Sequence, residues 1–222
     1  MPSKGGPNII TDGLVFAVDA ADANSYPGSG TTWKDWSGNG NDGTLVNGPT
    51  FDSGNGGSIV FDGTNDYGLL PNTDILTVGT QNFSFISWIY PLSWPLNTWS
   101  PIYVTERVGG IWIGQDNANR FILRAYSVTN FIQTPVLPPT NSWTQITITR
   151  TGTTASLYYN AIHQLTATAN HDFLPENTYI GNDGGASYFN GHISNIFLHK
   201  EKALTPSEIS QNYNALKSRF GL

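Results

Sequence analysis

The sequence contains no cysteine among its 222 residues. Disulfide bonds, thiol nucleophiles and thiolate metal sites are therefore excluded, so the packed core alone must stabilise the fold. No stretch approaches the roughly 20 consecutive apolar residues of a membrane-spanning helix. Residues 1–7 also lack the apolar segment of a secretory signal. We therefore expect neither membrane insertion nor export by the general secretory route.

Charged residues are scarce, at 12% of the chain, and the formal net charge is -6. Nine acidic residues and one base, Lys34, lie between Asp12 and Asp74. Sequence-independent binding to nucleic acid depends on Lys and Arg neutralising phosphates, so we expect no nucleic-acid partner. The C-terminal stretch is locally basic. Its Lys217 to Arg219 segment either anchors the domain to an acidic neighbour or compensates the dipole of a terminal helix.

Glycine and proline are abundant, with 24 and 13 copies, and apolar residues make up 38% of the chain. That composition favours many short strands joined by tight turns around a sizeable core. We see no linker, repeat or low-complexity tract, so we interpret residues 1–222 as one domain.

Period-2 patterns predict the strands. Leu14, Phe16 and Val18 alternate with smaller residues, whereas Phe83 to Tyr90 is apolar on both faces and therefore reads as a central strand covered on both sides. Further short strands are expected at 44–46, 58–62, 67–70, 102–105, 110–115, 121–126, 143–150, 154–159, 162–166, 178–181 and 192–199. Strands of this size, spaced about every eight to twelve residues, are typical of an all-β sandwich or barrel. We expect 58–62 and 67–70 to form a hairpin across the Asp62-Gly63 turn.

One helix is predicted, over 205–218. Thr205 can act as N-cap, Pro206 occupies the first helical position, and Glu208 completes a capping box. Three apolar side chains then recur on one face: Ile209, Tyr213 and Leu216. Such a stripe must dock on the sandwich. Residues 1–12 are expected to form an N-terminal arm.

A series of motifs follows in order along the chain: Asp35-Trp36-Ser37-Gly38-Asn39-Gly40, Ile59-Val60-Phe61-Asp62-Gly63, Phe83-Ser84-Phe85-Ile86-Ser87-Trp88, Trp143 to Arg150, Tyr179-Ile180-Gly181, Phe189-Asn190-Gly191-His192 and Ala203-Leu204-Thr205-Pro206. Together they resemble the laminin G-like, concanavalin A-like jelly-roll family from about residue 13 to 216. The resemblance implies an all-β, two-sheet antiparallel jelly-roll sandwich with one C-terminal helix. The family often has a Tyr-x-Asp-Gly hairpin where this chain reads Tyr158 to Ala161, so we expect a looser turn there.

The flanks carry a second resemblance. Thr11 to Phe16 and Asn212 to Phe220 look like segments of laminin G-like structural proteins of tailed bacteriophages. This resemblance implies a virion surface location, with other virion proteins or further copies of the chain, as a homo-oligomer, for partners. The alternative is a free carbohydrate-binding module of a bacterial surface or secreted protein, with an extracellular or cell-surface location.

Jelly-roll glycosidases share this fold, so the sequence is compared with what their mechanism requires. A retaining mechanism needs two carboxyl groups about 5 Å apart. None of the four glutamates stands two or four residues from another acid on a predicted strand: Glu106, Glu176, Glu201 and Glu208. Asp62 and Asp66 have suitable spacing but straddle a turn, where Asx-turn roles are the simpler explanation. Because the four histidines are scattered and no nucleophile elbow is present, we expect no enzyme and no catalytic residue.

Calcium is the one metal that the sequence suggests, and no cofactor is required. The resemblance implies structural calcium held by loop oxygens, because the family often binds this ion through Asp and Asn side chains. The candidate ligands lie in two predicted loops: Asp62, Asn65, Asp66, Asn182 and Asp183. The alternative is that these residues only form the turns.

The stretch 91–101 holds two tryptophans and three prolines, which is unusual for a loop. A rigid exposed indole is suited to stacking on a sugar ring, so glycans are the expected ligands. The candidate ligand-binding residues are Trp94, Trp99, Tyr103, Trp112 and Tyr126. The alternative is that Trp94 and Trp99 close one end of the sandwich. The other tryptophans, at 33, 36, 88 and 143, are interpreted as core or loop anchors.

Overall fold

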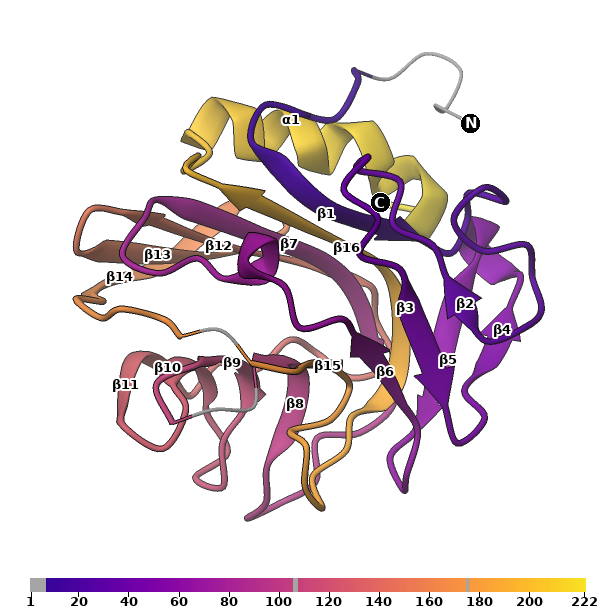
Figure 1. Ribbon diagram of the computed structural model, residues 1–222, viewed down its shortest axis with the longest axis horizontal. Coiled ribbons are helices and arrows are strands. Elements are labelled where there is room, and N and C mark those ends of the chain that lie inside the picture. Colours follow the sequence, from indigo (N-terminus) through magenta and orange to yellow (C-terminus); the bar gives the residue numbers. More distant parts are fainter. Residues whose placement is uncertain (1–6, 106–107, 175) are drawn as a thin grey trace.

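The computed structural model describes residues 7–105, 108–174 and 176–222. Two antiparallel sheets of eight strands each face one another, here named sheet A and sheet B (Figure 1). The predicted all-β jelly-roll sandwich with a C-terminal helix is confirmed. Sheet A contains β1 (Leu14–Asp19), β4 (Thr50–Asp52), β5 (Ser58–Asp62), β7 (Phe83–Pro91), β12 (Thr144–Thr151), β13 (Thr154–Tyr159), β14 (Ile162–Thr168) and β16 (Asn190–Lys200). Sheet B contains β2 (Thr32–Trp33), β3 (Gly43–Val46), β6 (Tyr67–Leu70), β8 (Ser100–Thr105), β9 (Ile111–Gln115), β10 (Phe121–Ala125), β11 (Thr129–Thr134) and β15 (Thr178–Ile180). The short 3-10 helices η1 (Gly54–Gly56) and η2 (Asp74–Leu76) lie in connections.

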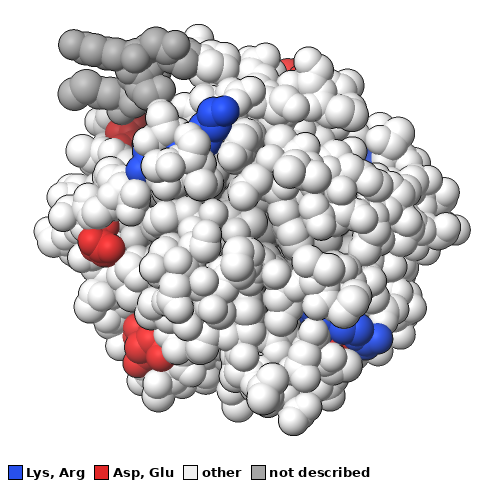
Figure 2. Space-filling model, turned by 180° about the vertical axis from the view of Figure 1, so that it is seen from behind, with Lys and Arg blue, Asp and Glu red and all other residues white. Residues whose placement is uncertain are grey.

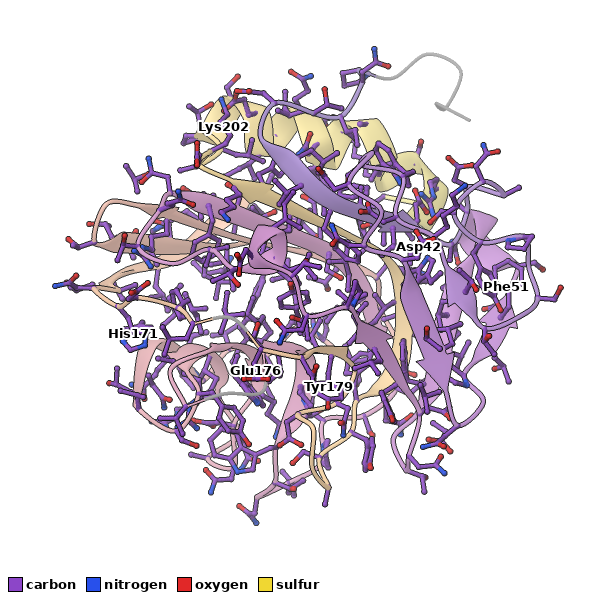
Figure 3. All side chains as sticks on the ribbon, in the orientation of Figure 1. Asp42, Phe51, His171, Glu176, Tyr179 and Lys202 are labelled. Carbon is purple, nitrogen blue, oxygen red and sulfur yellow. The ribbon has the colours of Figure 1, made fainter. Side chains whose placement is uncertain are left out.

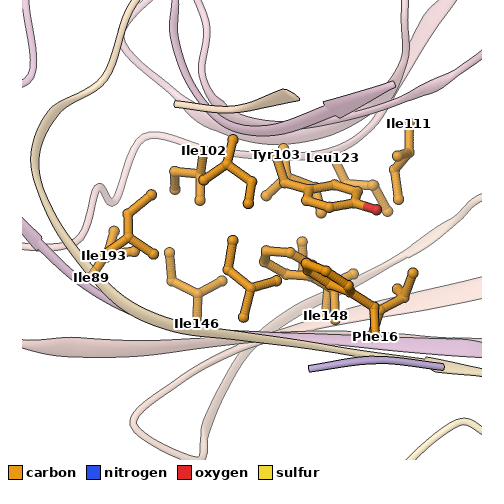
Figure 4. Close-up of a cluster of buried hydrophobic side chains, with 14 of the residues drawn as sticks. Phe16, Ile89, Ile102, Tyr103, Ile111, Leu123, Ile146, Ile148 and Ile193 are labelled. Atoms are coloured by element: carbon orange, nitrogen blue, oxygen red, sulfur yellow. The ribbon is translucent and has the colours of Figure 1, made fainter. Parts of the chain in front are cut away.

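The core lies between the two sheets. In most strands, alternate side chains point inward and are fully or almost fully buried, whereas the inward side chains of the edge strands β4 and β14 are partly buried. Figure 4 shows nine of these side chains meeting from both sheets: Phe16, Ile89, Ile146, Ile148 and Ile193 of sheet A, and Ile102, Tyr103, Ile111 and Leu123 of sheet B. Burial of each such side chain contributes about 1.5–3 kcal/mol. This inter-sheet core is what replaces the absent disulfides.

Strand β7 is the central strand of sheet A, as predicted. It pairs with β12 on one side and β16 on the other. Phe83 and Phe85 point into the inter-sheet core, whereas Ile86 packs in a second apolar cluster on the outer face of the sheet. The two apolar faces seen in the sequence are therefore both covered.

Helix α1 (Pro206–Leu216) covers that outer face of sheet A, and the chain continues as the 3-10 helix η3 (Lys217–Phe220) (Figure 1). The predicted capping box is present, since Thr205 accepts from the Glu208 backbone and Glu208 accepts from the Thr205 backbone. Tyr213 and Phe220 stack on Trp88, with ring centroids 5.7 Å and 4.1 Å away. Docking of the apolar stripe is thereby confirmed.

The described part of the N-terminal arm lies beside this helix. The Ile10 backbone N–H donates to Asn212 Oδ1 at 2.7 Å, and Ile9 and Ile10 pack in the cluster beneath the helix. Residues 1–6 of the predicted arm lie outside the described residues. Both ends of the described chain are thus on the sheet A side of the molecule (Figure 1).

The basic end of the helix is bound within the domain. Arg219 donates to both carboxylate oxygens of Asp19, at 2.8 Å and 3.1 Å, and also to Ser194 Oγ at 2.7 Å. Lys217 places its ammonium 5.4 Å from the centre of the Tyr213 ring. Arg219 therefore anchors η3 to β1 of its own chain.

The predicted hairpin at 58–70 is wrong. Strand β5 pairs with β4 and β16 in sheet A, whereas β6 pairs with β3 and β15 in sheet B. The turn at Asp62 to Asp66 therefore carries the chain from one sheet to the other. Turn residues reverse or redirect a chain equally well, and the choice here depends on partner strands distant in the sequence.

The looser turn expected after Tyr158 is also wrong. Strands β13 and β14 are joined by two residues only, Asn160 and Ala161, with φ of 50° and 63°. Two-residue hairpins with positive φ at both positions match the twist of antiparallel strands. Pairing of Tyr159 with Ile162 fixes the loop length, so Ala161 adopts a left-handed conformation despite its side chain.

The surface is weakly charged. Figure 2 shows one side of the molecule on which most atoms belong to neither basic nor acidic residues. Among the residues that the structure describes, no helix has both the length and the apolar character needed to cross a membrane.

Candidate functional site

A row of residues crosses the outer face of sheet B, the face turned away from sheet A. Residues in direct register on neighbouring strands share one face of a sheet. The register joins seven residues across seven strands: Thr44, Leu69, Tyr179, Val104, Trp112, Arg124 and Asn130. Their chain neighbours Leu45, Ile180 and Leu123 lie in the inter-sheet core, so this outer row faces away from it. Tyr179 of the row is labelled in Figure 3.

An aromatic cluster covers part of the outer row. Trp99, from the loop between β7 and β8, folds over the sheet and meets Trp112 edge to face, with ring centroids 5.3 Å apart. Val104, Trp112 and Ile122 are buried beneath, and Trp99 and Tyr126 remain partly exposed. An edge-to-face pair contributes about 0.5–1.5 kcal/mol beyond area burial, so Trp99 is fixed in place.

Arg124 belongs to the same surface. Its guanidinium carbon lies 4.8 Å from the centre of the Trp99 ring, a cation–π arrangement. Burial lowers the pKa of Arg124, against the smaller effects of Tyr126 and Asp116, but a guanidinium stays charged at any ordinary pH. The aromatic cluster and Arg124 together combine flat ring surfaces with a fixed positive charge.

The structure brings together three of the five predicted ligand-binding residues, Trp99, Trp112 and Tyr126. Tyr103 lies apart from them, because a β-bulge between Pro101 and Tyr103 turns both Ile102 and Tyr103 into the inter-sheet core. There Tyr103 packs against Phe85, with ring centroids 5.3 Å apart.

Trp94 is also separate from the aromatic cluster. Its Nε1 donates to the Pro138 carbonyl at 2.7 Å, and its ring packs against Phe189 at the margin of the inter-sheet core. Trp94 therefore lies where the alternative interpretation expected it, at one end of the sandwich. The sequence did not single out Leu69, Arg124 or Tyr179, since only the strand register aligns them with Trp112.

Four of the five predicted calcium ligands lie in the two loops expected, and Asp62 is the last residue of β5, directly before one of them. Asp62 Oδ1 accepts from the backbone N–H of Thr64 and Asn65, and Asp66 Oδ2 accepts from the Asp62 N–H at 3.2 Å. In the other loop, Asn182 Oδ1 accepts from the Gly184 N–H at 2.7 Å, and Asp183 Oδ1 accepts from the backbone of Gly185 and Ser187. The bonds from Asp62, Asn182 and Asp183 to the backbone two residues further on are the Asx turns of the alternative interpretation.

In the described part of the chain, no three His, Cys, Asp or Glu side chains gather closely enough to hold a metal ion. The calcium assignment stays a prediction.

Asp62 and Asp66, the two acids with suitable spacing for a catalytic pair, have pKa values shifted in opposite directions. Burial raises the pKa of Asp66, and the nearby Asp62 charge adds to that effect. Burial acts in the same direction on Asp62, but backbone N–H groups of Thr64 and Asn65 outweigh it and lower its pKa. Of the glutamates, Glu208 caps the helix and Glu201 accepts from Gln81. Glu106 lies outside the described residues.

A serine, a histidine and an aspartate meet at one point that the sequence did not reveal. Ser58 Oγ lies 3.1 Å from His192 Nδ1, and Asp52 Oδ2 lies 3.5 Å from the same nitrogen. A nucleophile–base–acid relay needs the serine and the acid on opposite ring nitrogens. This cluster therefore lacks relay geometry, and Ser58 is fully buried.

A laminin G-like family model, described as the concanavalin A-like lectin/glucanases superfamily, matches residues 62–210. No curated protein matches the chain.

Several solved structures share the fold. The binding domain of Paraclostridial Mosquitocidal Protein 1 superposes with a TM-score of 0.73 at 17% identity, over 92% of this chain and 52% of that one. Domain 4 of AbnA, a GH43 extracellular arabinanase from Geobacillus stearothermophilus solved in complex with arabinotriose, gives 0.70 at 19% identity, over 90% of this chain and 98% of that one. Trypanosoma rangeli sialidase gives 0.68 at 15% identity, over 93% of this chain and 33% of that one. At these identities the likeness concerns the fold.

Proposed function

The chain belongs to the concanavalin A-like lectin/glucanases superfamily, and on that premise we propose that it is a non-enzymatic domain that binds a saccharide on the outer face of sheet B. The observation that carries the proposal is the aromatic cluster with Arg124. Partly exposed rings of Trp99 and Tyr126 lie beside a fixed guanidinium. Ring faces suit the C–H faces of a pyranose, and a guanidinium donates hydrogen bonds to sugar oxygens.

The architecture supports this placement. Helix α1, η3 and the N-terminal arm cover the part of the outer face of sheet A formed by β1, β7 and β16. Within the described residues, no helix packs on the outer face of sheet B. This chain matches 98% of the length of the arabinanase domain, and that domain was solved in complex with arabinotriose.

The non-enzymatic part of the proposal rests on the carboxylates and the histidine. Asp62 and Asp66 are bound into one turn, and His192 meets Ser58 and Asp52 through a single nitrogen. Neither arrangement provides the two separate groups that acid–base or covalent catalysis requires.

Titration calorimetry of the whole chain against a broad panel of oligosaccharides tests the proposal. Trp99→Ala and Tyr126→Ala should each weaken binding by about tenfold or more, because aromatic anchors dominate small interfaces. Trp143→Ala is the matched control. Its indole packs on Phe220 on the sheet A side, so its loss should lower stability and leave the affinity unchanged. The proposal would be contradicted if no oligosaccharide of the panel bound, or if the affinity stayed the same in both Trp99→Ala and Tyr126→Ala.

We further propose that the domain is displayed on a virion. The support is the resemblance of the two flanking segments to phage structural proteins, and these segments run through β1, α1 and η3. They lie on the sheet A side, so a domain attached there would present sheet B outward. Purified particles should contain the chain in stoichiometric amount. Its absence from particles, with glycan binding retained, would favour the free carbohydrate-binding module.

Self-association is proposed through the edge of sheet A. Strand β14 is an outermost strand of that sheet, none of its seven residues is Asp, Glu, Lys or Arg, and Ile162 is 67% exposed. Natural edges are usually protected by charge or proline, so this edge is suited to pairing with a second copy. Light scattering should give a dimer that Ile162→Lys with Thr168→Lys converts to a monomer. A monomeric parent protein would refute the pairing.

A further inference from the structure

Arg124 differs from the other arginines that the structure describes. The other three all have acceptors for their N–H groups: Asp116 for Arg120, Asp19 for Arg219, and backbone carbonyls for Arg150. Arg124 makes no hydrogen bond or ion pair with any described residue, and its Nε is buried without a partner. A buried donor without an acceptor is costly, and Arg124 is only partly buried, so the rest of its guanidinium can meet an acceptor from outside the chain.

The guanidinium is held in a defined position. Arg124 lies on β10 in register with Trp112, and its charged end stacks on Trp99 at 4.8 Å. A guanidinium carries a planar fork of parallel N–H donors, and a planar carboxylate accepts from such a fork through two bonds at once. A stacked arginine loses little further freedom on binding.

The local charge favours an acceptor with a single negative charge. Asp116 is close enough to act on the pKa of Arg124, but its carboxylate is already bound by Arg120 at 2.6 Å. That pair is neutral as a whole. The described part of the aromatic cluster therefore offers one unpaired positive charge, which matches a monoanionic carboxylate better than a phosphate dianion.

We propose that Arg124 recognises the carboxylate of an acidic sugar, so that the ligands are glycans that contain uronic or sialic acid residues. This inference rests on the proposed function and adds the chemical class of its ligand. The sugar ring would lie against Trp99 and Tyr126, with its carboxylate on the Arg124 fork.

Calorimetry of the full chain with matched saccharide pairs tests the inference. The pairs are tri-galacturonate with its methyl ester, and sialyllactose with lactose; sulfated lactose serves as a second anion. A charge-assisted pair contributes enough for the acidic member to bind about tenfold to a hundredfold more tightly than the neutral one. Arg124→Gln should abolish this preference, and Arg124→Lys, which keeps the charge but not the fork, should retain only part of it. Lys34→Gln removes the same charge from an exposed site and should change nothing.

The outcomes separate the two proposals. Equal affinity for acidic and neutral members, with loss of both in Trp99→Ala, would overturn the role of Arg124 and leave saccharide binding intact. Sulfated lactose binding as tightly as sialyllactose would overturn the assignment to carboxylates. No binding to any saccharide would overturn both proposals. Thermal unfolding of each variant shows whether a loss of affinity is a loss of fold.

Discussion

The ion pair between Arg219 and Asp19 should determine whether the C-terminal segment stays docked. Both side chains are mostly buried, at 16% and 14% exposure, and Arg219 makes two bonds to the carboxylate and one to Ser194. Removal of one partner from a buried pair costs about 3–5 kcal/mol, and the residual exposure reduces this to about 2–3 kcal/mol. Arg219→Met, which keeps the length of the stem, is therefore expected to lower the free energy of unfolding by that amount.

A double-mutant cycle with Asp19→Asn isolates the pair. Asn at this position retains an oxygen for the Ala21 backbone N–H, which Asp19 Oδ1 now accepts at 2.9 Å. The free energy of unfolding would be measured by urea titration for the parent, both single variants and the double variant. We expect a coupling energy of about 1.5–3 kcal/mol. Single variants that each cost less than about 0.5 kcal/mol, or strictly additive effects, would show that the pair contributes nothing and that apolar contacts alone dock the helix.

Three further predictions concern other parts of the chain. Ala161→Gly should raise the free energy of unfolding by about 0.5–1 kcal/mol, because the relief of left-handed strain exceeds the added chain entropy. Ala155→Gly, at a core position, should lower the free energy of unfolding. A lower free energy of unfolding in both variants would refute the strain at Ala161. Burial lowers the pKa of His199, so the unfolded chain takes up a proton at a higher pH than the folded chain. The melting temperature should therefore decline as the pH falls below about 6.5 and on through the lower pKa of the folded state. His199→Asn should flatten this decline, and an unchanged pH profile in that variant would contradict the reasoning. If loop calcium is bound, a chelator should lower the melting temperature of the parent but not of Asp62→Ala; equal curves for the parent with and without calcium would refute the metal.

Sequence patterns predicted the elements that depend mainly on residues close together in the chain. The capping box at Thr205 and the two-sided apolar pattern of 83–90 depend on residues within one turn or one strand, and both elements form as expected. Strands β2, β4 and β11 were not predicted. Two of them have only two or three residues, and β11 reads Thr-Asn-Phe-Ile-Gln-Thr, so none offers enough alternation to detect.

Long-range pairing decided what the local signals could not. The Asp62 turn joins different sheets because β5 finds β16 and β6 finds β15, more than 100 residues along the chain. Tyr103 was grouped with the surface aromatics, yet the bulge in β8 reverses its direction. A bulge changes side-chain facing without any change in residue pattern, since it depends on how the neighbouring strand aligns.

The sequence by itself determined an all-β chain without cysteine, dense in turns, with one capped helix and an unusual number of tryptophans near residue 95. Those properties follow from residue conformational preferences and from spacing along one segment. Only the tertiary structure decided that Trp99 folds over Trp112, and that Arg124, 25 residues further along the chain, stacks on it without an acceptor. That surface exists because register aligns strands from distant parts of the chain, and register is a property of the whole sheet.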